Sequence, residues 1–204
     1  MPAFMDSTRI PELTLAGKIG LVPHFGKVLV STLFRLFTSP VRAIFGGAKA
    51  NTLLKDIIYT AIRTNISAMT PAQENYVKGT TEKIYLDFAK KAKFQPDTDV
   101  LSSGMKVHWL GTKSAKKILL YLHGGGYVMP CLPGHVQWCY DTVQEFAKDH
   151  SISCVFPSYT LAPAAQYPTQ LKQAVECVDM LINKMGKKPS DVYMPAIVVR
   201  DLSG

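Results

Sequence analysis

Three consecutive glycines, at positions 124–126, follow an apolar run in the sequence LLYLHGGGYV of residues 119–128. Glycine loses more backbone entropy on folding than any other residue, so three in a row indicate a place where side chains would obstruct a function. Three uses fit such a run: a loop that cradles phosphate, a bare turn, or backbone N–H groups aimed at a reacting oxygen. The phosphate-binding patterns G-x-x-x-x-G-K-[ST] and G-x-G-x-x-G are absent from the sequence. The sequence on either side of the glycines therefore has to decide between a bare turn and N–H groups aimed at a reacting oxygen.

Short apolar runs and helical patterns alternate around the glycines. Four runs are predicted as strands: residues 105–110, 117–122, 152–157 and 192–199. Apolar side chains recur at helical spacing in two segments: Val136, Cys139, Tyr140, Val143, Phe146 and Ala147, then Leu171, Ala174, Val175, Val178, Leu181 and Ile182. Gly186 is the expected C-terminal cap of the second helix, and Pro195 would disturb the start of the last strand.

Alternating strands and helices predict an α/β fold with right-handed crossovers and a mostly parallel sheet flanked by helices. The glycines then lie at the carboxyl end of a central strand. Open α/β sheets bind their ligands at that edge. The spacing of residues 123–126, HGGG, also matches the oxyanion motif of lipases and esterases.

Two motifs together resemble a known family. The sequences HGGGY at 123–127 and YTLAP at 159–163, followed by Tyr167-Pro168, are similar to the hormone-sensitive-lipase-like branch of the α/β-hydrolases. This branch is also called the α/β-hydrolase fold-3 group and includes fungal steryl-acetyl-hydrolase-type esterases. The resemblance covers roughly residues 55–199. The sequence departs from the family at Ala164, where a glutamate is usual.

The resemblance implies a carboxylic-ester hydrolase that transfers an acyl group through an oxyanion hole, without cofactor or metal. Its substrate would be a small-molecule ester. Each N–H donor that faces the tetrahedral oxyanion stabilises it by roughly 2.7–4 kcal/mol. The resemblance assigns the oxyanion donors to Gly124 and Gly125, and the shape of the loop to Gly126. His123 would support the loop, because the family uses a later histidine as base, and Tyr127 and Tyr159 would line the substrate pocket.

The nucleophile motif of the family, G-x-S-x-G, is absent from the sequence. Laying residues 201–204 on the family's G-D-S-A-G puts Leu202 in the place of the serine, which leaves Ser203 as a displaced candidate nucleophile. The acid and the base have no positions here. We therefore expect a truncated, nearly inactive family member whose strand at 192–199 forms an open, self-associating edge. The alternative is a non-catalytic module that binds an acyl ligand or a membrane surface.

The segment from Leu13 to Thr70 is basic, with seven lysines and arginines against one acid, Asp56. No uncharged stretch approaches the roughly 18 residues that span a bilayer, so no transmembrane helix is expected. One interpretation is a basic amphipathic segment on an anionic membrane, with Phe34, Leu36 and Phe37 in lipid. The other is a set of helices that pack on the rest of the domain and are interrupted at Pro40 and at Gly46-Gly47. We favour the second, because amphipathic helices more often face a protein core.

These patterns predict a helical extension over residues 1–70, a turn at Thr70-Pro71, and the N-terminal part of an α/β-hydrolase domain over residues 71–204. The formal charge of +8 is dispersed and accompanies no nucleic-acid motif, so no nucleic-acid partner is expected. The cysteines form no C-x-x-C pair, which disfavours zinc: Cys131, Cys139, Cys154 and Cys177. The N-terminus lacks a signal-peptide layout, so we expect reduced thiols and an intracellular protein, cytoplasmic or peripheral on a membrane.

Overall fold

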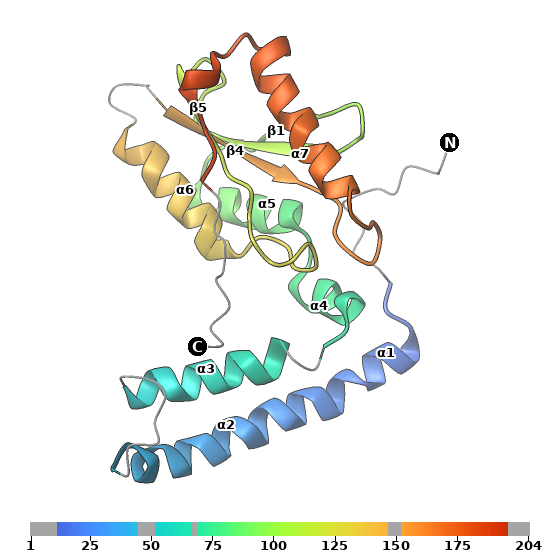
Figure 1. Ribbon diagram of the computed structural model, residues 1–204, viewed down its shortest axis with the longest axis vertical. Helices are drawn as coiled ribbons and strands as arrows, with labels where there is room; N and C mark the ends of the chain where they lie inside the picture. Colours follow the sequence, from blue (N-terminus) through green and yellow to red (C-terminus); the bar gives the residue numbers. More distant parts are fainter. Residues whose placement is uncertain (1–11, 45–51, 67–68, 147–151, 196–204) are drawn as a thin grey trace. The chain divides into compact units, whose positions relative to one another are not determined.

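The computed structural model describes residues 12–44, 52–66, 69–146 and 152–195. The described chain divides into two compact units (Figure 1). Residues 12–74 form a helical unit, and the residues from Asn75 onward form a unit built on a sheet.

The sheet has five strands in the spatial order β1-β2-β4-β3-β5. Their bounds are β1 Asp97–Val100, β2 Lys106–Leu110, β3 Lys117–Leu120, β4 Ile152–Ser158 and β5 Val192–Tyr193. β4, β3 and β5 are parallel to one another, whereas β2 runs antiparallel to both β4 and β1. The predicted α/β fold is confirmed, with an antiparallel edge on the otherwise parallel sheet. Residues 196–199 of the expected last strand lie outside the described residues.

Helices cover both faces of this sheet. They are α5 Thr81–Ala92 and α6 Pro133–Glu145 on one face, and on the other α7 Thr169–Asp179, which continues as a π-helical turn over Met180–Lys184. The helix α4 Pro71–Lys78 precedes α5 in the chain. Along β3, Leu119 packs in the core under α5 and α6, and Ile118 and Leu120 pack in the core under α7. This alternation is the two-residue period of a strand that is buried on both faces.

The apolar face predicted for α7 and the turn after it is confirmed toward its end, where Leu181 is buried and Val178 packs against the core, and is wrong in its first turns. Leu171 and Val175 are exposed, and the buried side of the helix carries Gln170, Gln173 and Cys177. Both glutamines bond the loop that follows β4, which fixes the rotation of the helix. The expected burial of Phe146, after α6, is likewise wrong, because this side chain is exposed. The expected glycine after the second helix is confirmed, since Gly186 has a positive φ of 67°.

The helical unit contains α1 Leu15–Ile19, α2 Leu21–Ile44 and α3 Leu53–Ile66. The expected interruption at Pro40 is wrong, because α2 continues through it. Contacts with α3, such as the bond from Ser39 to Asp56, offset the roughly 3 kcal/mol that a proline costs inside a helix. Gly46-Gly47 lie outside the described residues. The predicted restart is confirmed: α4 begins at Pro71.

The outer sides of α2 and α3 carry exposed apolar side chains. Within the described residues, one stretch, Leu15–Val41, has the length and composition needed to cross a membrane. Signal sequences and core helices of soluble proteins share these properties.

Candidate functional site

The glycine loop leaves the carboxyl end of β3 and turns sharply. Gly125 has φ +121° and Gly126 has φ +60°, both in the left-handed region that favours glycine. The carbonyl oxygen of Gly125 accepts hydrogen bonds from the amides of Val128 and Met129, at 3.0 and 3.1 Å. A Cβ on Gly125 would lie 3.0 Å from the Met129 Cβ and 3.1 Å from its carbonyl oxygen, so this position requires glycine. A Cβ on Gly126 would meet no atom within 4 Å.

The amides of Gly124, Gly125 and Gly126 donate to no acceptor among the described residues. Gly124 and Gly125 are half-buried, whereas Gly126 is exposed. Half-buried backbone donors are normally paired, and successive unpaired N–H groups form a concavity that attracts anions. The loop therefore presents open main-chain donors at the edge of the sheet where α/β proteins bind ligands.

The ring of His123 ties the first glycine to the body of the fold. Its Nδ1 lies 2.9 Å from the carbonyl oxygen of Gly124, which can only accept, so Nδ1 carries the proton. Nε2 then accepts from the Thr81 hydroxyl at 3.3 Å, and that hydroxyl accepts in turn from the amide of Cys131 at 3.1 Å. The tautomer of His123 is thus fixed by its neighbours.

Tyr159 completes this support. Its hydroxyl donates to the carbonyl oxygen of His123, and the two rings stack with centroids 4.4 Å apart. Burial lowers the pKa of His123 to about 4 and raises the pKa of Tyr159 above its ordinary value. Both side chains are therefore neutral near pH 7, and His123 has no free nitrogen with which to act as a base. These contacts support its assignment to the structure of the loop.

The two sequence motifs meet through the backbone. The amide of Ala162 donates to the carbonyl oxygen of Tyr127 at 2.8 Å, and Asn75 Nδ2 donates to the carbonyl oxygen of Ala162 at 2.7 Å. The rings of Tyr127 and Tyr159 pack edge to face, with their centroids 5.9 Å apart. About half of Tyr127 is exposed. Of the two expected pocket residues, Tyr159 is buried within the loop support and Tyr127 lies at the surface.

Sequence reasoning missed the residues of α7 that hold the second motif. The amide of Thr160 donates to Gln173 Oε1 at 2.8 Å, and Gln173 Nε2 donates to the Thr160 hydroxyl at 3.0 Å. Gln170 Nε2 donates to the carbonyl oxygen of Thr160 at 2.8 Å. Two glutamines and Cys177 at helical spacing, i, i+3 and i+7, were the signal available in the sequence.

Ser203, the displaced candidate nucleophile, lies outside the described residues, as do Asp201, Leu202 and Gly204. The described residues therefore include the loop and its supports but not the candidate nucleophile. The four cysteines are buried and free of disulfides, and burial raises the pKa of Cys131 and of Cys177 to about 12, which keeps these thiols protonated. No cluster of three metal-binding side chains occurs in the described parts of the chain.

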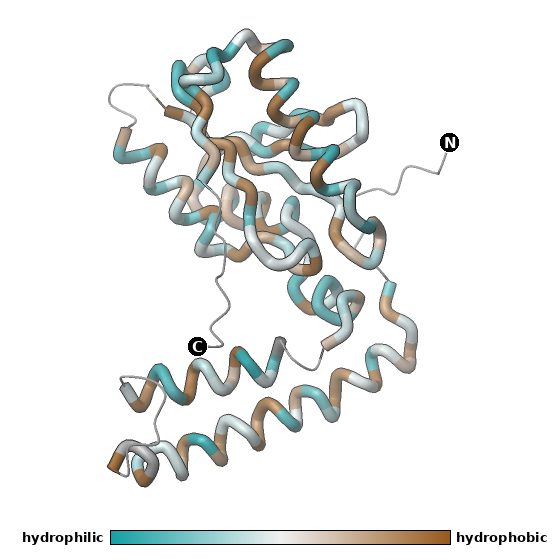
Figure 2. The backbone as a smooth tube through the Cα atoms, viewed as in Figure 1, coloured by the Kyte–Doolittle hydropathy of each residue, from teal (hydrophilic) through white to brown (hydrophobic). Residues whose placement is uncertain are grey.

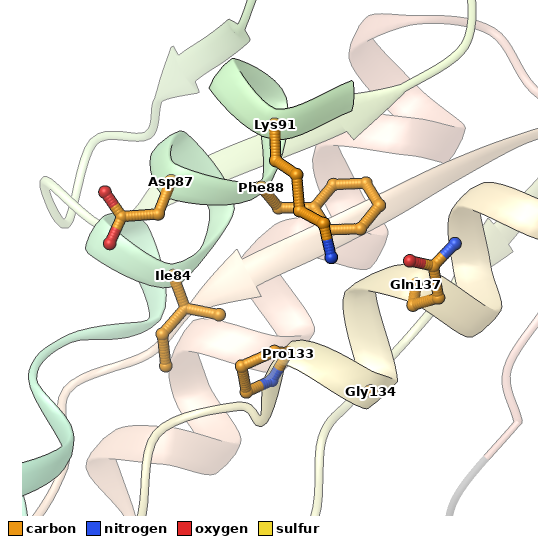
Figure 3. A pocket seen from close by; sticks show the side chains of 7 residues that line it. All are labelled: Ile84, Asp87, Phe88, Lys91, Pro133, Gly134 and Gln137. Atoms are coloured by element: carbon orange, nitrogen blue, oxygen red, sulfur yellow. The ribbon is translucent and has the colours of Figure 1, made fainter. Parts of the chain in front are cut away.

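A hollow of about 410 Å³ lies between α5 and α6 (Figure 3). Its lining residues are Ile84, Asp87, Phe88, Lys91, Pro133, Gly134 and Gln137. No residue of the 123–127 loop lines it. The hollow is therefore separate from the glycine loop.

Comparison with known proteins identifies the fold of this region. Residues 119–195 match the model of the alpha/beta hydrolase fold family, so this segment carries that fold. An ethyl acetate hydrolase of Pseudomonas putida is 31% identical over 86 residues, which are 42% of this chain and 26% of that protein. Carboxylesterase 20 of Arabidopsis thaliana is 34% identical over 73 residues, which are 35% of this chain and 22% of that protein.

A solved esterase of Pyrobaculum calidifontis is 19% identical, with a TM-score of 0.42 over 58% of this chain and 41% of that one. The chain thus spans only about a quarter of the length of the curated relatives it matches. The matched segment includes both motifs and extends from β3 to the residues just after β5.

Proposed function

We propose that this chain, whose residues 119–195 carry the α/β-hydrolase fold, provides the oxyanion-binding part of a carboxylic-ester hydrolase of the esterase or lipase type. One observation carries the proposal: the adjacent amides of Gly124 and Gly125 have no acceptor among the described residues, and buried neutral side chains hold the loop. The hydrolase and carboxylesterase names of these two relatives support the reaction class.

The loop fits the chemistry of acyl transfer. Attack on an ester carbonyl converts the carbonyl oxygen into an oxyanion, and donors already aimed at that oxygen need no reorganisation as the charge develops. The absence of a Cβ at the glycines lets an acyl group approach the main chain. His123, Thr81 and Tyr159 act as positioning residues, because each contacts the loop or another support and none supplies a proton to the reaction.

The proposal includes a low activity for the 204 residues themselves, since they contain no G-x-S-x-G. Loss of the nucleophile or the base of a catalytic triad lowers turnover by roughly 10⁶, and the oxyanion hole with substrate binding retains only about 10³–10⁴ over water. An esterase-like loop without its attacking group should therefore show weak hydrolysis and no covalent intermediate.

Hydrolysis of p-nitrophenyl acetate by the purified chain tests this. We expect slow, linear product release without a burst, unchanged by Ser203→Ala. The Gly125→Ala variant, which disturbs the loop and leaves residues 196–204 intact, should lower this slow hydrolysis by roughly 10²–10³, the cost of losing one oxyanion donor. A burst of one equivalent that disappears in Ser203→Ala would contradict the proposal.

A further inference from the structure

The helical unit has its polarity reversed relative to a water-soluble protein. Where α2 faces α3, the contacts are hydrogen bonds between polar side chains. His24 Nε2 lies 3.0 Å from Asn65 Oδ1, and Arg35 Nε donates to the Thr60 hydroxyl at 2.9 Å. We call these side chains and the next pair the polar seam: His24, Arg35 and Ser39 of α2, with Asp56, Thr60 and Asn65 of α3.

Charge within the polar seam is internally compensated. The buried carboxylate of Asp56 accepts a 2.5 Å hydrogen bond from the Ser39 hydroxyl and lies 3.5 Å from Arg35 Nε. The side chain of Arg35 is only 25% exposed. A charge pair with this degree of burial costs desolvation energy, which is offset only when both members are hydrogen-bonded. Both members of this pair are bonded.

The opposite side of α2 is apolar and open. Six of its residues are between 45% and 77% exposed: Leu29, Val30, Leu33, Phe34, Phe37 and Val41. α3 repeats the pattern with Leu54, Ile58 and Ile62 on its outer side. Hydrophobic residues recur along the whole length of both helices in Figure 2. Soluble proteins rarely expose a continuous apolar surface of this size without a partner that covers it.

A lipid bilayer stabilises this arrangement of polar side chains between the helices and apolar side chains outside. Between helices in lipid, polar side chains bond one another, because the surrounding acyl chains offer no partner, and apolar side chains face outward. The 24 residues of α2 extend about 36 Å at 1.5 Å per residue, enough for a hydrocarbon core about 30 Å thick. A proline inside a helix, as at Pro40, is also better tolerated in membranes than in water.

We infer that the α2–α3 hairpin is embedded in a lipid bilayer, with the polar seam between the helices and the outer face of α2 against acyl chains. A second protein would cover one side of the hairpin, whereas apolar side chains line the outer sides of both helices. The exposed charges of α1 to α3 are basic, Lys18, Lys27, Lys55 and Arg63, and favour anionic headgroups. The inference is independent of the ester chemistry.

Flotation of the full chain with vesicles of phosphatidylcholine, with and without phosphatidylserine, tests the inference. We expect the chain to float with both, and more strongly with phosphatidylserine. The double variant Phe34→Ser/Phe37→Ser should lower the partition coefficient roughly 100-fold, because two exposed aromatic side chains leave the hydrocarbon. Leu171→Ser/Val175→Ser is the matched control: it removes two exposed apolar side chains from α7 and should change partitioning by less than about 2-fold.

The depth of insertion gives a second readout. In Phe34→Trp, lipids with brominated acyl chains should quench the added fluorescence, and the native tryptophans, Trp109 and Trp138, both lie outside the hairpin. The inference would be overturned if the two double variants lost partitioning equally, or if the brominated lipids caused no added quenching. It would also be overturned if salt alone abolished vesicle binding. So would an oligomer that forms without lipid and dissociates in Phe34→Ser/Phe37→Ser, because a second copy would then cover the hairpin. A mature protein that lacks residues 12–44 would also overturn it, since this segment would then be a signal sequence.

Discussion

The sheet unit and the hairpin bury opposite kinds of side chain. In the sheet unit, Leu119 of β3 packs in one apolar core and Leu120 packs in the other. In the hairpin, the hydrogen-bonded contacts between the helices form the polar seam, and many of the apolar side chains are exposed. The contrast teaches that amphipathic spacing indicates which residues share a face, whereas the environment decides which face is buried.

Acid should produce the largest effect within the sheet unit, because this unit encloses two neutral histidines. Burial lowers the pKa of both His108 and His123 to about 4, against 6.5 for the unfolded chain. The unfolded state therefore binds more protons between these values, and stability that is complete above pH 6.5 is lost as pH falls toward 4. At pH 5 each histidine should cost about 2 kcal/mol of unfolding free energy, about 4 kcal/mol together.

Urea unfolding at pH 7 and pH 5, followed by the fluorescence of the buried Trp109, measures this loss. His123→Gln removes one titrating group and should reduce the difference between the two pH values by about half. Equal stability at both pH values would show that the histidines are not held neutral by burial.

The next largest difference between the two units should appear when an apolar side chain is truncated in each of them. Leu120→Ala removes a fully buried side chain from the core under α7 and should cost about 3 kcal/mol. Phe34→Ala, on the exposed face of α2, should change the same unfolding transition by less than about 0.5 kcal/mol. Unfolding of each variant in mild detergent, followed at Trp109, tests the pair. A large effect of Phe34→Ala would mean that the outer face of α2 stabilises the sheet unit, and the contrast between the units would fail.

A smaller effect should distinguish the two sides of α7. Gln173→Leu leaves the Thr160 amide without its acceptor and should cost about 1.5 kcal/mol, although the new side chain is more apolar. Leu171→Gln, which makes the reverse change on the exposed side of the same helix, should cost less than about 0.5 kcal/mol. Thermal unfolding of both variants decides the order. If Gln173→Leu were the milder change, the apolar face predicted from the sequence would be the better description of α7.

The order of the elements in the sheet unit could be predicted from the sequence, and their orientation only in part. The runs at 105–110, 117–122 and 152–157 became β2, β3 and β4, because short apolar segments bounded by charge or glycine fit a buried strand. β1 was missed, since its sequence, DTDV, is short and half acidic and gains its strand form by pairing with β2.

Long-range hydrogen bonds explain what the sequence could not provide. The rotation of α7 depends on glutamines that bond a loop, a contact that apolar periodicity does not encode. At the candidate site, the HGGG pattern identified the loop. The partnership of His123 with Thr81, 42 positions away, required the fold. In the helical unit, the apolar face of α2 was recognised, but the environment facing it depends on the polar seam with α3.

The central claim is that the main-chain donors of the glycine loop are open to an anionic oxygen. Labelling the chain with ¹⁵N-glycine and titrating it with acetate, whose carboxylate resembles the oxyanion, tests this at the donors themselves. The account predicts saturable shifts of the Gly124 and Gly125 amide signals, no shift for Gly186, which follows the π-helical turn after α7, and loss of the response in His123→Ala. Loop signals that stay unchanged while acetate is added, or that move no more than Gly186, would contradict it.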